Sequence, residues 1–242
     1  MKTNLFLILI ALSIFRTQSA QSQTILDDIN MVLITGPGIS WISSDDNTIE
    51  TKGFRLSYKI HAMADYALND RFSITGGVGL SLAMGGKMKY QKGGDLWSES
   101  KLSVARGDSL PDGVQLGYFI NYIDFPIGFR MRTNQFGKFR FFAHMPELSL
   151  GLRTRAKGSI EGQGVSSSGE QIKSQIGFLN FGWGIGAGTE FYYSEKLTLT
   201  GGIRFFQSLT DITDDSGRFR DGSKENSKGV IHNLDLRLGI IF

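Results

Sequence analysis

The sequence predicts an all-β fold: an eight-stranded antiparallel up-and-down transmembrane β-barrel, preceded by a cleaved signal peptide. Three observations predict it. Apolar and polar residues alternate with a period of two along several long segments, the connections between these segments are alternately short and long, and helical periodicity is nearly absent after residue 20. The alternation marks strands whose two faces meet different surroundings, and alternating short turns and long loops are typical of outer-membrane barrels.

The first residues have the layout of a secretory signal. Lys2 is followed by an apolar run over 5–15 and then by the small and polar stretch "RTQSAQSQ". A charged start, a short apolar middle and small residues at a cleavage site are the three parts of a signal peptide. We therefore expect a signal peptide at 1–20, a short N-terminal segment at 21–30 and the barrel at 31–242.

The composition excludes several classes of protein. The chain of 242 residues has no cysteine and only three histidines, so disulfides and thiolate sites are ruled out. The net charge is +3 and the basic residues are interspersed with acidic and apolar ones, whereas a nucleic-acid binder concentrates its basic residues. We predict no nucleic-acid partner, no cofactor, no metal site and no catalytic residues.

The strands are read from their alternation. The clearest is "FRLSYKIHAMADYAL" at 54–68, which is apolar on one face and largely polar on the other. Eight such segments are expected near 31–43, 53–68, 71–85, 113–134, 138–154, 175–193, 196–210 and 229–242. The turns at 67–72, 133–139 and 193–197 are short, and the polar loops at 44–52, 86–112, 155–174 and 211–228 are long. The long loops would be extracellular and the short turns periplasmic.

The polar faces predict what fills the barrel. The interior of eight strands is just wide enough for side chains, so glycines at 182–188 would leave room for bulky partners. Buried charges need partners to offset their desolvation, so we expect a closed lumen filled by paired charges rather than an open pore. The predicted network consists of Arg55, Lys59, Asp65, Asp124, Arg130, Arg132, Glu147, Glu190, Arg204, Asp235 and Arg237.

Two segments break their alternation. In "GYFINYIDFPIGFRMRT" the apolar set begins as Leu116, Tyr118, Ile120 and Tyr122, and then changes phase near 121–123. We interpret the apolar residues on both sides of this change as facing lipid and the change itself as a β-bulge. A similar shift lies around Pro146. We expect Pro126 and Pro146 at or near bulges, because proline cannot donate a ladder hydrogen bond.

The chain ends on "LDLRLGIIF", an alternating stretch with a final aromatic residue. We expect it to be the closing strand, paired with the first one. Leu238, Ile240 and Phe242 resemble the terminal signal that the outer-membrane assembly machinery reads. Aromatic residues are also expected at both membrane interfaces, as in other membrane barrels.

The stretch "YIDFPIGFRMRT" at 122–133 resembles a strand of the small PorT-like outer-membrane barrel proteins, and "GIGAGTEFYYSEKLTLTGGIRF" at 184–205 resembles their later glycine-rich hairpin. The resemblance implies an eight-stranded barrel in which Tyr122, Asp124 and Pro126 are markers of the fold. It also implies a link to type IX secretion and gliding, the role associated with PorT itself.

The functional prediction is a small integral protein of the bacterial outer membrane, not an enzyme, with a structural or interaction role through its extracellular loops. Its expected partners are outer-membrane lipid and lipopolysaccharide, the assembly machinery and other envelope proteins. The alternatives are a component of a type IX secretion complex, a narrow porin or transporter, and a barrel enzyme. A soluble lipocalin-like barrel is a further alternative at the level of fold.

Overall fold

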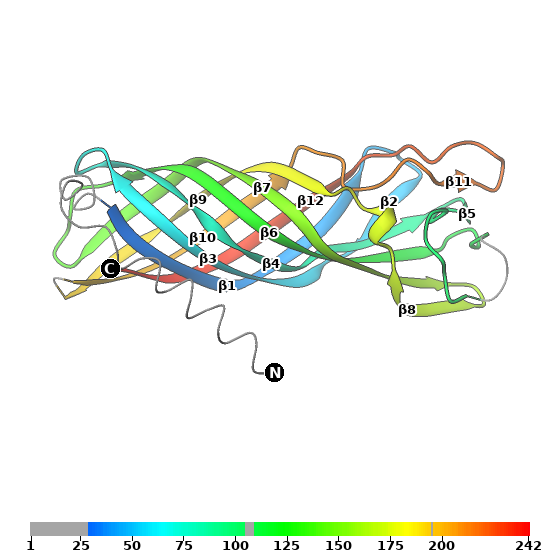
Figure 1. The fold of residues 1–242 in the computed structure, drawn as a ribbon, viewed down its shortest axis with the longest axis horizontal. Coiled ribbons are helices and arrows are strands. Elements are labelled where there is room, and N and C mark those ends of the chain that lie inside the picture. Colours follow the sequence, from blue (N-terminus) through cyan, green and yellow to red (C-terminus); the bar gives the residue numbers. More distant parts are fainter. Residues whose placement is uncertain (1–28, 105–108, 195) are drawn as a thin grey trace, which may run out of the picture.

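The computed structural model describes residues 29–104, 109–194 and 196–242, and eight long antiparallel strands in it close into a barrel (Figure 1). The signal peptide expected at 1–20 lies outside these residues. The strands of the barrel, in their order around it, are β1 (Ile29–Ser44), β3 (Arg55–Ala67), β4 (Phe72–Tyr90), β6 (Gln115–Arg132), β7 (Phe139–Gly162), β9 (Leu179–Ser194), β10 (Leu197–Ser208) and β12 (Gly229–Ile241). The predicted fold is confirmed.

The two ends of the barrel differ as expected. The short turns and the C-terminus lie at one end, on the left of Figure 1. The other end carries the long loops and the minor elements β2 (Ile49–Gly53), β5 (Gly94–Asp95), β8 (Val165–Gln171) and β11 (Arg218–Phe219), together with the 3₁₀ turn η2 (Lys173–Gln175). The described part of the chain contains no helix long and apolar enough to cross a membrane.

Pairing of the first and last strands closes the barrel. β12 lies between β1 and β10, and Met31 and Phe242 exchange two backbone hydrogen bonds of 2.9 Å. Along β12, Leu236 is 45% exposed whereas its neighbour Asp235 is 2% exposed. The closing strand is therefore confirmed, with apolar residues outside and charged residues inside, and the barrel sheet has no open edge.

The glycine row of β9 makes room inside the barrel, as predicted. A Cβ on Gly182 would lie 2.4 Å from Cζ of Phe206, and one on Gly188 would lie 2.6 Å from Cζ of Phe142. Both rings come from other strands of the barrel. Small residues on one strand thus accommodate large ones on its neighbours.

The face assignment for the first half of β6 was wrong. Leu116, Tyr118, Ile120 and Tyr122 are at most 1% exposed and point into the barrel, not toward lipid. The alternation along β6 continues without a break into Asp124, which is also buried. The apparent change of phase arises because the barrel interior itself changes from apolar to charged at this level.

The irregularities lie on the strands that flank β6. The register between β4 and β6 shifts between Ser81 and Met84, and that between β6 and β7 shifts at the level of Asn121. Asn121 supports the first of these, because its side-chain oxygen accepts a hydrogen bond of 3.0 Å from the amide of Ala83. The bulge expected near 121–123 was therefore predicted at the correct level along the barrel axis. The extra residues, however, lie in β4 and β7 and not in β6.

Pro146 lies in a further bulge, where β7 shifts register against both β6 and β9 between His144 and Glu147. Pro126 pairs in regular register with Ser149, two residues before the corresponding shift on β6. Both prolines are therefore close to the same irregularity, and only Pro146 is part of it.

Two of the connections expected as loops, at 86–112 and 155–174, begin as continuations of barrel strands. β4 runs to Tyr90 and β7 to Gly162, beyond the ends expected at 85 and 154. Within this extension the inward residues form an apolar core, to which the loops contribute buried side chains such as Trp97, Leu110 and Ile212. These loops are thus part of the packed structure rather than solvated chain.

Aromatic residues mark both ends of the apolar belt. Near the short turns, the rings of Phe72 and Phe129 stack at 5.5 Å. Near the long loops, Trp41 stacks on His232 at 5.3 Å. Tyr118, which was expected to face lipid, belongs instead to the interior core.

Gly36 provides a test of the closing seam. A Cβ at this position would lie 1.8 Å from the carbonyl oxygen of Leu236 on β12, and a backbone atom cannot rotate away. We expect Gly36→Ala to lower the free energy of unfolding by about 1–3 kcal/mol, the usual cost of overpacking. Urea titration of the folded protein in detergent measures this. In the matched control Gly201→Ala, the added Cβ would be 3.7 Å from its nearest neighbour, Leu238 Cδ2, so a change within about 0.5 kcal/mol is expected. Equal losses in the two variants would contradict the role of the seam.

Candidate functional site

The charged half of the interior is the first candidate site. In its layer nearest the short turns, Arg130 and Arg132 lie between Asp65 and Glu190. Arg130 Nη1 donates to Asp65 Oδ2 at 2.8 Å and to Glu190 Oε1 at 3.2 Å, and Arg132 Nε donates to Glu190 Oε1 at 3.0 Å. Arg132 also contacts Asp65. Each carboxylate thus receives both guanidinium groups, which offsets much of the cost of burying them.

Glu147 holds the next layer. It is fully buried on β7, accepts two hydrogen bonds of 2.7 and 2.8 Å from Arg237 on β12, and lies 2.9 Å from Arg204 Nη2 on β10. This bidentate geometry is the strong form of an arginine–carboxylate pair. One carboxylate therefore connects three strands across the barrel.

His144 connects these two layers. Arg130 Nε donates to His144 Nε2 at 2.6 Å, so this ring nitrogen acts as an acceptor. The other ring nitrogen, Nδ1, then carries the proton and faces Glu147 Oε2 at 3.5 Å. The tautomer is thus fixed by the donor on one side and the carboxylate on the other.

A third layer contains Lys59, Asp235 and Asp124. Lys59 Nζ is 2.9 Å from Asp235 Oδ2, and Arg204 approaches the same oxygen at 3.6 Å. Asp124 accepts from the hydroxyl of Ser81 and lies 3.5 Å from His61 Nε2. Toward the long loops this layer is followed by uncharged polar side chains, among them Asn233, whose amide donates to the Ser57 hydroxyl at 2.8 Å, and then by the apolar core.

The boundary between the two halves is closely packed. The ring of Phe206 contacts two cations of the charged half, with Lys59 Nζ 5.3 Å and Arg204 Cζ 5.1 Å from the ring centroid. A cavity between Phe206, Tyr122 and Met84 has a volume of about 10 Å³. This is about the space that one water molecule requires.

All the residues of the predicted network except Arg55 meet inside the barrel. The cations there are Lys59, Arg130, Arg132, Arg204 and Arg237, and the carboxylates are Asp65, Asp124, Glu147, Glu190 and Asp235. The cations and the carboxylates are equal in number, so the network carries no formal net charge when the buried histidines are neutral.

Arg55 was wrongly placed in this network. It begins β3 with the inward phase, but above Leu82 the strand β4 leaves β3 and pairs with β2 on that side instead. The side chain of Arg55 therefore meets the outer face of this extension, with its guanidinium carbon 4.9 Å from the centre of the Phe119 ring.

Sequence reasoning missed His61, His144 and Ser81 as members of the network. His61 has the same strand phase as Lys59 and Asp65, so the alternation itself could have identified it. Ser81 could not be identified in this way, because a small hydroxyl is common on either face of a strand. His144 lies beside the Pro146 bulge, which obscures its phase.

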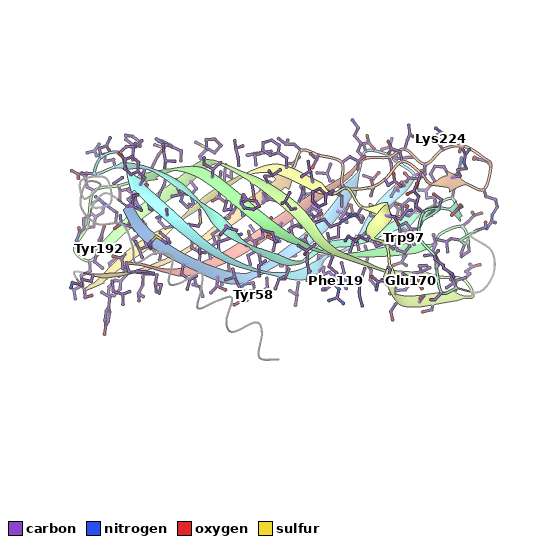
Figure 2. The ribbon with its side chains drawn as sticks, viewed as in Figure 1. Tyr58, Trp97, Phe119, Glu170, Tyr192 and Lys224 are labelled. Atoms are coloured by element: carbon purple, nitrogen blue, oxygen red, sulfur yellow. The ribbon has the colours of Figure 1, made fainter. Side chains whose placement is uncertain are left out.

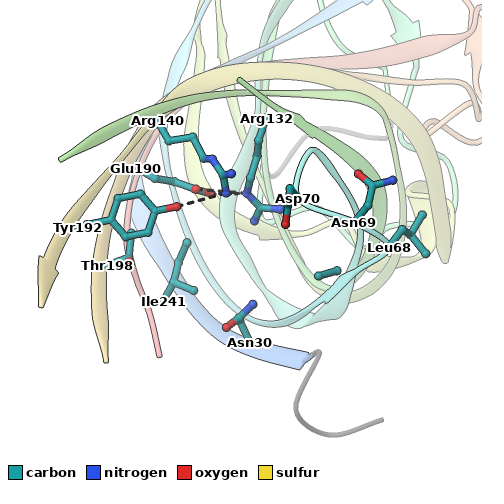
Figure 3. A pocket seen from close by; sticks show the side chains of 11 residues that line it. Asn30, Leu68, Asn69, Asp70, Arg132, Arg140, Glu190, Tyr192, Thr198 and Ile241 are labelled. Atoms are coloured by element: carbon teal, nitrogen blue, oxygen red, sulfur yellow. Dashed lines mark hydrogen bonds and ion pairs between the residues drawn. The ribbon is translucent and has the colours of Figure 1, made fainter. Parts of the chain in front are cut away.

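A second candidate site is the cavity at the end with the short turns, shown in Figure 3. It has a volume of about 370 Å³, and its polar lining includes Arg132, Arg140, Glu190 and Tyr192. Arg140 Nη1 donates to the Tyr192 hydroxyl at 3.3 Å. The lower layer of the charge network forms part of this lining, since Arg132 and Glu190 belong to both.

Ser81, Asp124 and His61, in the described part of the barrel, are not arranged as a nucleophilic triad. A serine triad requires the histidine between the hydroxyl and the acid, whereas here Asp124 lies between Ser81 and His61. In the described ranges, no group of three or more His, Asp and Glu side chains is arranged to hold a metal ion. The geometry therefore suits charge neutralisation and packing.

Comparison with solved structures finds barrels of low sequence similarity. The neisserial surface protein NspA is 14% identical, with 88% of this chain and 95% of that chain covered and a TM-score of 0.43. Ail from Yersinia pestis is 12% identical, with 88% and 98% covered and a TM-score of 0.35. The outer membrane protease OmpT from Escherichia coli is 8% identical, with 94% and 99% covered and a TM-score of 0.40. No curated protein matches the sequence.

The family is shown by the sequence itself. Residues 19–214 match the family model described as the outer membrane protein beta-barrel domain. This match spans most of the chain and most of the closed barrel described above. The chain therefore belongs to the outer membrane protein beta-barrel domain family, and it is a protein of the bacterial outer membrane.

Proposed function

We propose that the protein is a non-conducting outer-membrane barrel that acts through its extracellular end, in a structural or interaction role. The observation that carries this proposal is the filling of the barrel along its axis. Paired charges occupy the half near the short turns and an apolar core occupies the other half. A charged solute would have to displace both.

The construction of the extracellular end supports an interaction role. Strands β5 and β11 pair there, and Lys92 Nζ contacts Asp221 Oδ2 at 2.9 Å across the loops that carry them. The Ser223 hydroxyl, followed by the Lys92 ammonium, lowers the pKa of Asp221, so this carboxylate stays charged well below neutral pH. Loops held in one arrangement present a preformed surface, which lowers the entropy cost of binding.

Two finer roles remain alternatives. The resemblance of 122–133 and 184–205 to PorT-like proteins supports a place in a type IX secretion or gliding complex. Purification in mild detergent followed by identification of bound proteins tests this role, and recovery of secretion-machinery components would favour it. The cavity of about 370 Å³ at the short-turn end is the feature that a narrow porin would use as its mouth. We do not propose an enzymatic activity.

Single-channel recording tests the non-conducting interior. We expect purified protein in a planar bilayer to produce no steady conductance steps, because buried ion pairs and the apolar core exclude a continuous column of water. A general porin recorded in the same bilayers verifies that channels would be detected. Reproducible steps from the folded protein would overturn the proposal in favour of the porin alternative.

Glu147→Gln tests the charge network. Removing this carboxylate leaves Arg204 and Arg237 without their shared partner, and an uncompensated buried charge costs about 3–5 kcal/mol. We expect a loss of this size in urea unfolding. The matched control is Glu161→Gln, which removes the exposed pair with Lys87 at 2.7 Å and should cost about 0–1 kcal/mol. A similar effect of the two substitutions would show that the network is not a main source of stability.

Phe242→Ala tests the proposed assembly signal of Leu238, Ile240 and Phe242. The ring is 60% exposed, and the backbone bonds to Met31 do not depend on it. We expect less folded protein in the outer membrane of cells, with unchanged unfolding of the protein refolded in vitro. Phe139→Ala, which removes another exposed ring at the same end, should leave assembly unchanged. If Phe242→Ala reduced assembly and stability to the same degree, the proposed signal role would fail.

A further inference from the structure

A small groove lies on the outer wall of the barrel, just above its apolar belt. It has a volume of about 210 Å³ and is formed by β6, the hairpin of β7 and β8, and the start of β3. Phe119, labelled in Figure 2, is one of the residues that line it. This volume is below the ~300–1,000 Å³ of pockets for drug-sized ligands, so the groove fits a headgroup rather than a whole large molecule.

Three cations line this groove without a carboxylate partner. Arg55, Arg155 and Lys157 form no ion pair with any residue that the structure describes. The nearby Lys87 differs, because Glu161 neutralises it at 2.7 Å. Three unpaired cations around one groove repel one another, and an anion bound there would relieve this repulsion.

The groove faces outward at the level of the lipid headgroups. On β7 the outward residues Leu148 and Leu150 belong to the exposed apolar belt, and Leu152 ends it. Because the bulge adds one residue to β7 between Leu152 and Arg155, Arg155 lies two ladder steps above Leu152 and Lys157 lies four. At ~3.4 Å per step and a tilt of ~35–45°, Arg155 is about 5 Å and Lys157 about 10 Å above Leu152. The polar region of a leaflet begins directly outside the hydrocarbon and is about 5–8 Å thick in a phospholipid bilayer, so Arg155 lies within it and Lys157 lies at its outer edge.

The local structure holds the cations around an open space. Phe119 pairs with Lys157 across β6 and β7, and the Arg55 guanidinium lies 4.9 Å above its ring. Ser168 adds a hydroxyl from β8, while Gly169 has no atom within 4 Å of the position its Cβ would take. The groove therefore offers donors without side chains that fill it.

We propose that this groove binds a phosphate group of an outer-leaflet glycolipid. Arg155 and Lys157 meet the phosphate oxygens as charge-assisted donors, and Arg55 closes the site from β3. Leu56, which follows Arg55 on the side nearer the apolar belt, is 71% exposed and provides an apolar surface for the acyl chains of the same molecule. This apolar surface is why the ligand is a lipid-linked phosphate rather than a soluble one. The inference is independent of whether the lumen conducts.

Native mass spectrometry of the folded protein in detergent, titrated with bisphosphorylated lipid A, tests the proposal. We expect saturable binding of lipid A, no comparable binding of its fully dephosphorylated form, and no competition by millimolar inorganic phosphate. Arg155→Glu/Lys157→Glu should weaken binding by at least about tenfold, because two attractive contacts become repulsive. Binding should also weaken as the salt concentration rises.

The matched control is Lys224→Glu/Lys228→Glu, which makes the same charge change on a different extracellular loop and should change binding by less than about twofold. Heat-modifiable migration on gels verifies that each barrel is folded. If the first double variant does not fold, Arg55→Gln provides the test, with an expected loss of a few-fold. Equal binding of dephosphorylated lipid, equal effects of the two double variants, or displacement by free phosphate would each overturn the proposal.

Discussion

The narrow interior of an eight-stranded barrel is the constraint on which the rest of this structure depends. Such a barrel has just enough room for its own inward side chains, so each of these must find a partner across the axis. Near the short turns the partners are charges, and Glu147 alone connects Arg204 and Arg237 from two other strands. The glycines of β9 are a consequence of the same narrow interior, because the space that they leave is occupied by large rings such as that of Phe206.

The interior changes character along the axis, and this change explains the shape of the molecule. Above Phe206 the inward residues are apolar, and the core continues past the belt into the extension formed by β4 and β7. There the loops supply side chains such as Trp97 and Ile212, so the end with the long loops is packed like the core of a soluble β-protein. The half near the short turns cannot contain such an apolar core, because apolar side chains there would replace the charge pairs that link its strands.

Much of this architecture could be predicted from the sequence, because a two-residue period reveals a strand whenever its two faces differ in polarity. It locates the strands and, for nearly all the charged residues, the inward face. The same signal fails where the barrel interior is itself apolar, because an apolar face then no longer identifies the side that meets lipid. Tyr118 and Ile120 lie inside, yet their alternation reads like that of a lipid-facing strand. It fails again for Arg55, whose neighbouring strand is exchanged at a bulge that only the three-dimensional pairing reveals. The histidines of the network depend on the same pairing, since His144 lies beside the bulge at Pro146.

A barrel filled in this way leaves its outer surface as the place where recognition can occur. The belt of Leu, Ile and Phe side chains fixes the level of the wall in the membrane, and the residues directly above it meet the charged layer of the leaflet. There Lys87 forms an ion pair with Glu161 and needs no further anion. Its role is to cover the outer surface of the barrel with its aliphatic stem. Arg155 and Lys157 have no such carboxylate in the described part of the chain, although carboxylates such as Glu161 lie on the same hairpin. Leaving two cations unpaired beside a groove costs stability through their mutual repulsion, and an anion that the membrane itself supplies removes that cost.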